Sequence, residues 1–121
     1  MEDKEKEVNG MELSVEKVKN VAVVKLLGHS LEASNVEEFK RNIAPVLGEN
    51  TSVVLDIQNL DSVDSSGLGA FLSCLRTLNA AGGDLKICRM RKPVRALFEL
   101  VRMHRICDVF DTVDEAVEAF E

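Results

Sequence analysis

The chain has no tryptophan and no tyrosine, and its five phenylalanines are its only aromatic residues by the usual count. Few side chains are therefore available to stack on nucleic-acid bases. The three cysteines, Cys74, Cys88 and Cys107, form no C-x-x-C pair, and their number is odd. This pattern argues against a disulfide framework and against a zinc site. We expect the chain to hold no metal and no cofactor.

Long apolar runs are also absent from the sequence. No stretch approaches the roughly 20 consecutive apolar residues that a helix needs to cross a bilayer. Residues 2–7 are all charged, and no apolar segment of the kind found in secretory signals follows them. We therefore expect a cytoplasmic protein that makes no direct contact with a membrane.

Acidic residues outnumber basic ones, 21 to 15, and the resulting net charge of −6 argues against nucleic acid as a general partner. One stretch has the opposite balance, since residues 86–105 carry seven basic side chains and a single acidic one, Glu99. The seven are Lys86, Arg89, Arg91, Lys92, Arg95, Arg102 and Arg105. Two interpretations remain open: a solvated helix face, or a patch for an acidic protein surface or anionic lipid headgroups.

Apolar residues recur with strand and helix periods in alternation along the chain. The expected strands lie near residues 11–15, 21–27, 53–57, 85–90 and 107–110. The expected helices begin near residues 34, 65, 93 and 112. This order predicts an α/β fold, one compact domain with a four- to five-stranded mixed sheet and about four helices. We assign residues 1–10 to a flexible N-terminal segment and residues 11–121 to the domain.

Local signals predict where the helices begin and end. Ser34 and Glu37 fit a capping box at the start of the first helix. Pro45 should kink or shorten the last turn of that helix, and Gly48 should end it. The glycines at 82 and 83 should end the second helix in a left-handed conformation. The inner stripe of the third helix should consist of Val94, Leu97, Phe98 and Val101.

The centre of the sequence is the strand 53–57, the loop after it, and the helix that follows Asp64-Ser65-Ser66-Gly67. The first turn of a helix has unpaired N–H groups and a partial positive charge. A serine at this position either caps the helix or carries a phosphate, which the N–H groups and the dipole would both favour. Local sequence leaves both roles open for Ser65, with Ser66 as the other candidate cap.

The run Asp64-Ser65-Ser66-Gly67-Leu68-Gly69, placed after a strand of the Val-Val-Leu-Asp type, resembles the signature of anti-sigma factor antagonists of the STAS domain family. The resemblance covers residue 11 to the C-terminus and implies a compact βαβ fold. It implies phosphorylation at Ser65 and binding to an anti-sigma factor that is also a serine kinase. It further implies a PP2C-type phosphatase that resets the protein, no enzymatic activity of its own, and a monomer when free.

We expect residues around the serine to contact the partner, although Asp64 could instead be a helix-entry carboxylate or a hydrogen-bond partner of the loop. The expected contact residues are Asp64, Ser66, Gly67, Leu68, Gly69 and Ser73. The small side chains at the start of the helix would let a partner come close, although they could equally serve the packing of the helix on its own sheet. The family pattern Gly-x-Leu-Asp after the second strand is replaced here by residues 28–32, Gly-His-Ser-Leu-Glu, with one extra residue and Glu32 for aspartate.

Three other functions compete with this interpretation. STAS domains also serve as accessory subunits of membrane transporters, including phospholipid ABC transport systems, and would dock through the same surface. A serine hydrolase would need His29 or His104 as base and a Gly-x-Ser-x-Gly elbow, but Val63 occupies the place of the first glycine. Nucleotide binding is disfavoured because the phosphate-binding loop with its lysine is missing.

Overall fold

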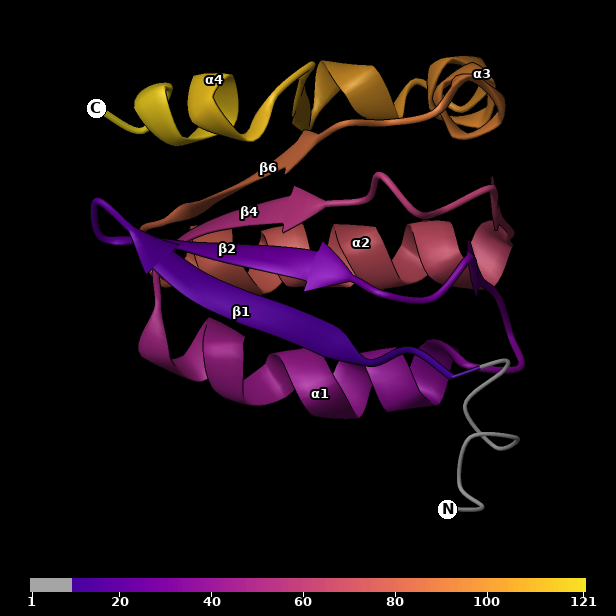
Figure 1. The fold of residues 1–121 in the computed structure, drawn as a ribbon, viewed down its shortest axis with the longest axis horizontal. Helices are drawn as coiled ribbons and strands as arrows, with labels where there is room; N and C mark the ends of the chain where they lie inside the picture. Colours follow the sequence, from indigo (N-terminus) through magenta and orange to yellow (C-terminus); the bar gives the residue numbers. More distant parts are fainter. Residues whose placement is uncertain (1–9) are drawn as a thin grey trace.

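A computed structural model of the chain describes residues 10–121, which form one layered α/β domain (Figure 1). Its strands are β1 (Leu13–Val18), β2 (Val21–Leu26), β3 (Ser30–Leu31), β4 (Ser52–Asp56), β5 (Ser62–Val63), β6 (Asp84–Cys88) and β7 (Asp108–Phe110). Its helices are α1 (Val36–Glu49), α2 (Ser65–Ala80), α3 (Lys92–Leu100) and α4 (Val113–Glu118), with a 3₁₀ turn η2 at Met103–Arg105. The α/β fold with a mixed sheet and four helices is confirmed. Most of the expected segment 1–10 lies outside the described residues.

Five strands form the main sheet in the order β1-β2-β4-β6-β7. β1 and β2 are an antiparallel hairpin, while β2, β4, β6 and β7 run parallel. Parallel neighbours need crossover connections, and the helices that provide them cover the faces of the sheet. In Figure 1, α1 and α2 lie on one face of the sheet and α4 lies on the other. The inner strands β2 and β4 are therefore buried along most of their length.

The larger core lies between the sheet and the helices α1, α2 and α3. Three fully buried phenylalanines connect these helices: the rings of Phe39 and Phe71 are 6.1 Å apart, and so are those of Phe71 and Phe98. Aromatic pairs at this distance add to the stabilisation that burial alone provides. The start of α2 is thus fixed by packing on both sides, which matters for the site that it carries.

The smaller core lies under α4 and contains one buried charge, Lys86. The Lys86 ammonium group is 3.1 Å from Asp84 and 3.0 Å from Asp108, and it lies 4.8 Å from the ring centre of Phe120. Burial by itself lowers the pKa of Lys86, but the hydrogen bonds to Asp108 and Asp84 outweigh it, and the net pKa is raised. This lysine is a structural cation of the sheet.

Three local predictions about the helices are wrong. Asn35 and not Ser34 occupies the N-cap position of α1, and its side chain bonds the loop before the helix instead of the N–H groups of the first turn. α1 also continues through Pro45 and past Gly48 to Glu49. Pro45 is exposed, so water can reach the carbonyl that its missing N–H leaves free. Val101 follows the end of α3 and is 47 % exposed, so it is outside the inner stripe.

The predicted end of α2 is confirmed. Gly82 has a φ of +84°, a left-handed conformation that glycine adopts without strain. Gly83 then passes so close to Thr51 that a Cβ atom on residue 83 would lie 1.9 Å from the Thr51 carbonyl oxygen. The glycine pair therefore both ends the helix and permits the entry into β6.

Candidate functional site

The site begins at the carboxyl end of the sheet, where the chain leaves β4, forms the two-residue strand β5, and enters α2. Asp64 is the N-cap of α2, and its Oδ1 accepts a hydrogen bond of 3.0 Å from the N–H of Gly67. The expectation that Ser65 or Ser66 caps the helix is therefore wrong. Aspartate is as good a cap as serine, and Ser65 becomes the first helical residue. Its side chain is exposed and has no hydrogen-bond partner within residues 10–121.

The Asp64 carboxylate joins two parts of the chain. Its second oxygen, Oδ2, accepts a hydrogen bond of 3.1 Å from the N–H of Ala33, in the loop before α1. The hydrogen bond from Gly67 is the main cause that lowers the pKa of Asp64, and the bond from Ala33 adds to it. The carboxylate therefore remains ionised beside Ser65 at neutral pH, and it fixes the loop before α1 to the first turn of α2.

The loop before α1 lies directly against the serine-bearing turn. β3 pairs in parallel with β5, and the backbone N–H of Asp64 donates to the Leu31 carbonyl at 3.2 Å. The N–H of Asp61 donates to the His29 carbonyl at 2.7 Å. Asn35, which is 4 % exposed, closes the loop by accepting from the N–H of Glu32 and donating to the Ser30 carbonyl. The atypical segment 28–32 thus lies beside Ser65 despite its extra residue.

The sequence gives little sign of this neighbour. Two-residue strands such as β3 and β5 have no detectable periodicity, and residues 30 and 62 are far apart along the chain. Asn35 was missed because Ser34 completed a better-known pattern one position earlier. An asparagine directly before an apolar helical stripe is itself a helix-start signal, and it could have pointed to the correct N-cap position.

The small residues of α2 separate into two groups. Gly67 is buried, and a Cβ atom there would lie 2.5 Å from the Leu31 carbonyl oxygen and 2.7 Å from the Val63 side chain. Ala70 is 2 % exposed and belongs to the core. Gly69 and Ser73 are exposed, and a Cβ atom on Gly69 would meet nothing within 4 Å. Gly67 therefore serves internal packing, whereas Gly69 and Ser73 lie on the surface with Ser65. Leu68 is half-buried against the core.

Arginines from the end of β6 and the start of α3 hold the loops at this end of the sheet. Arg89 forms a two-point contact with the buried Asp56 carboxylate, with distances of 3.2 and 2.8 Å. Arg91 donates to the Gln58 carbonyl at 2.6 Å and to Asp61 at 3.0 Å. Because Asp61 precedes β5, Arg91 also supports the turn that presents Ser65.

These contacts divide the basic stretch at residues 86–105. Lys86, Arg89, Arg91 and Arg95 each lie within 4 Å of an aspartate carboxylate. Lys92, Arg102 and Arg105 are exposed and form no ion pair with any other residue in the range 10–121. The two interpretations of the stretch therefore apply to different residues, and only Lys92, Arg102 and Arg105 form a free cationic surface within residues 10–121.

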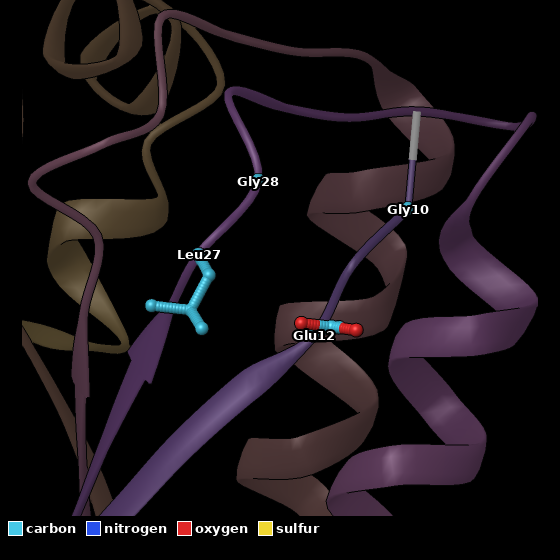
Figure 2. Close-up of a pocket in the computed structure, with 4 residues that line it drawn as sticks. All are labelled: Gly10, Glu12, Leu27 and Gly28. Carbon is cyan, nitrogen blue, oxygen red and sulfur yellow. The ribbon is translucent and has the colours of Figure 1, made fainter. Parts of the chain in front are cut away.

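Hollows in the surface lie along β1. One hollow of about 520 Å³ is lined by Glu12, Leu13, Val15, Glu38 and Asn42. Another, of about 120 Å³, is lined by Gly10, Glu12, Leu27 and Gly28, at the start of β1 and the end of β2 (Figure 2). It is smaller than the roughly 300 Å³ at which ligand pockets usually begin. Within residues 10–121 no three His, Cys, Asp or Glu side chains are grouped to hold a metal ion.

The three cysteines are buried, and burial raises the pKa of each thiol to about 12. They are therefore poor nucleophiles at neutral pH. None of the helices described for residues 10–121 is both long and apolar enough to span a membrane.

Comparison with known proteins adds to this geometry. Residues 12–116 match the model of the STAS domain family. The Anti-sigma F factor antagonist of Paenibacillus polymyxa is 26 % identical over 112 residues, which cover 92 % of this chain and 96 % of that protein.

Solved structures with similar folds include two anti-sigma factor antagonists. One, from Mycobacterium paratuberculosis, has a TM-score of 0.82 at 19 % identity and covers 91 % of this chain and 93 % of its own. The phosphorylated form of the Bacillus cell fate determinant SpoIIAA has a TM-score of 0.68 at 23 % identity. The match covers 91 % of this chain and 100 % of the SpoIIAA chain. The murine anion transporter Slc26a9 is similar over 84 % of this chain but only 18 % of its own, with a TM-score of 0.72 at 19 % identity. At these identities the three structures show a shared fold.

Proposed function

The chain belongs to the STAS domain family, and on that basis we propose that it is an anti-sigma factor antagonist controlled by phosphorylation of Ser65. The unphosphorylated form binds an anti-sigma factor that is also a serine kinase, and this binding releases a sigma factor. The kinase then transfers phosphate from ATP to Ser65, and the complex dissociates. A PP2C-type phosphatase removes the phosphate. The chain is a monomeric cytoplasmic substrate in this cycle and catalyses none of its steps.

The observation that carries the proposal is the position of Ser65. Its hydroxyl is exposed at the first helical position of α2, and the capping role is already filled by Asp64. A kinase can therefore reach the hydroxyl without opening the fold. The N-terminus of a 16-residue helix favours an added anion through its dipole and its free N–H groups. A solved protein of similar fold in a phosphorylated form supports control by phosphorylation.

The surface around Ser65 explains why phosphate would release the partner. Gly69 and Ser73 are exposed on the same helix and leave room for close contact, while Asp64, Ser66 and Leu68 border it. A phosphoserine adds about −1.5 to −2 charges and a bulky group at this contact. A loss of about 3–4 kcal/mol in binding free energy weakens the complex by a factor of several hundred. Exclusion of the partner, and no change of fold, is sufficient for this effect.

The proposal is tested by affinity capture from the native host with four baits: wild type, Ser65→Ala, Ser65→Glu and the control Ser14→Glu. Ser14 is an exposed serine of β1, so its variant adds the same charge elsewhere. We expect a kinase-like anti-sigma factor on every bait except Ser65→Glu. The purified kinase with ATP and Mg²⁺ should then phosphorylate wild type, but not Ser65→Ala, as detected by mass spectrometry.

The transporter-subunit alternative gives a different result in the same experiment. Its support is the fold shared with the domain of Slc26a9. If all four baits retain the same transporter component and none retains a kinase, the chain is an accessory subunit and the antagonist proposal is wrong.

A further inference from the structure

The segment from the end of α3 through η2 forms an unusual surface, which we name the 100–106 patch. It consists of Leu100, Val101, Arg102, His104, Arg105 and Ile106. Leu100 is 78 % exposed, Ile106 is 53 % exposed, and the three polar members are also exposed. Only Met103, between them, turns into the core, with 7 % of its surface exposed. The patch therefore combines three aliphatic side chains with two arginines and a histidine.

The backbone holds these residues in one compact place. Arg102 has a φ of +64°, a left-handed conformation that ends α3 and turns the chain. Successive turns follow, with the N–H of Arg105 bonded to the Arg102 carbonyl and the N–H groups of Ile106 and Cys107 bonded to the Met103 carbonyl. Buried Met103 and Cys107 anchor these turns to the core. The patch is a rigid surface rather than a loose loop.

We propose that the 100–106 patch is a second contact surface for the anti-sigma factor and receives an acidic segment of it that also carries an apolar side chain. This inference rests on the proposed function. Charge complementarity identifies the kind of partner. Four cations earlier in the basic stretch are each neutralised by an aspartate, whereas Arg102 and Arg105 have no acidic partner within residues 10–121 and border exposed aliphatic surface.

α3 connects the 100–106 patch to the loop that leads to Ser65. α3 begins where Arg91 supports the Gln58–Asp61 loop before β5, and its nine residues span about 13 Å. A standard interface covers roughly 800 Å² on each partner, a disc about 30 Å across. An acidic partner also fits the switch, because the arginines would attract it and a phosphate on Ser65 would repel it.

An anionic membrane fits the patch less well than an acidic protein. Two arginines contribute on the order of 30-fold to binding such a surface, and firm attachment needs a second strong signal such as an acyl chain. The chain as a whole carries a net charge of −6, which opposes that attraction. An acidic protein segment could contact the patch while avoiding the acidic remainder of the surface.

The test uses the purified anti-sigma factor that wild type captures, and it measures the Kd of the complex by calorimetry at low and high salt. The patch variants are Arg102→Glu/Arg105→Glu and Leu100→Ser/Ile106→Ser. The matched controls are Arg41→Glu on α1 and Val15→Ser on β1, both at exposed positions. Circular dichroism and thermal melting verify that each variant is folded.

We expect each patch variant to raise the Kd about tenfold, as rim charges and exposed apolar contacts do at interfaces, while the controls bind like wild type. The charge-reversal variant should also lose most of the salt dependence. If both patch variants bind like wild type while Ser65→Glu does not bind, the patch proposal is wrong and the antagonist function stands. If Ser65→Glu binds like wild type, the antagonist function fails, and the patch proposal fails with it.

Two further results would assign the patch to another partner and overturn the proposal. One is binding of wild type, but not of the charge-reversal variant, to phosphatidylglycerol vesicles. The other is a wild-type dimer in analytical ultracentrifugation that both patch variants convert to a monomer.

Discussion

Two glycines near the start of α2 lie in opposite surroundings, although they are only two residues apart. A side chain at Gly67 would meet the Leu31 carbonyl oxygen at 2.5 Å, whereas one at Gly69 would meet nothing. We expect Gly67→Ala to lower the free energy of unfolding by about 1–3 kcal/mol, because the backbone of β3 must move. Gly69→Ala should raise it by up to about 1 kcal/mol, since alanine favours the helix more than glycine does.

Urea denaturation of the two variants measures both effects. Gly69→Ala also separates stability from function, because it adds bulk on the proposed contact surface. We expect it to bind the anti-sigma factor more weakly than wild type even though its fold is more stable. Equal destabilisation of the two variants would show that the close contacts around Gly67 do not cause the loss of stability in Gly67→Ala.

The Asp64 carboxylate should make the stability of the fold depend on acid. Its pKa is lowered in the folded protein by the hydrogen bonds from Gly67 and Ala33, so its stabilising effect is complete above the unfolded value of about 4 and disappears as pH falls through the lower folded value. Asp64→Asn keeps a capping oxygen but cannot titrate. We expect wild type to have a higher melting temperature than Asp64→Asn at pH 6. The difference between the two melting temperatures should narrow steadily below pH 4. A constant difference would contradict this account.

At the scale of elements, the junction of β4 and β6 depends on one buried ion pair. The Asp56 side chain is 4 % exposed and the Arg89 side chain 35 %. Arg89→Met leaves the carboxylate buried without its counter-charge, and we expect a loss of about 2 kcal/mol in unfolding free energy. This is less than for a fully buried pair, because water reaches the arginine.

The matched variant for this pair is Arg89→Met combined with Asp56→Asn. The asparagine can still accept the hydrogen bond that Asp56 receives from the N–H of Gln58. The double variant should recover part of the loss, and the double-mutant cycle should give a coupling energy of about 1–2 kcal/mol. A coupling energy near zero would mean that the charge of Arg89 does not compensate Asp56.

The strands and helices differ in how well the sequence predicts them. The strands β2, β4 and β6 and the start of α2 followed from dense apolar runs and helical spacing, because burial on both faces leaves a strong pattern. The pairing of β3 with β5 left no such pattern, and so only the family resemblance, not the periodicity of the sequence, placed residues 28–32 near Ser65. This closeness depends on backbone pairing between distant residues and on the side chain of Asn35.

The candidate site was partly predictable for a similar reason. The motif identifies Ser65, and its place after a buried strand puts it at a helix start. The assignment of the cap failed because Asp64, Ser65 and Ser66 are all good capping residues, and only the tertiary contact with Ala33 favours Asp64. The division of the basic stretch into paired and free residues likewise depends on aspartates from distant strands and loops.

At the scale of the whole molecule, the switch is separated from the core that supports it. The core is anchored by three phenylalanines and a five-stranded sheet, whereas the Ser65 hydroxyl lies outside it. We therefore expect phosphorylation of Ser65 to leave the fold unchanged. The melting temperature should shift by no more than about 4 °C, the change that corresponds to less than 1 kcal/mol in a domain of this size.

Two-dimensional NMR of the phosphorylated and unphosphorylated forms measures this prediction residue by residue. Amide shifts should be confined to the first turns of α2 and to residues 29–35, which the Asp64 carboxylate and the β3–β5 pairing bring together. The unphosphorylated Ser65→Ala protein, treated with the same kinase, is the control for non-specific effects. Large shifts in the edge strand β7 or in α4, on the other face of the sheet, would show that phosphate changes the fold and does more than exclude a partner.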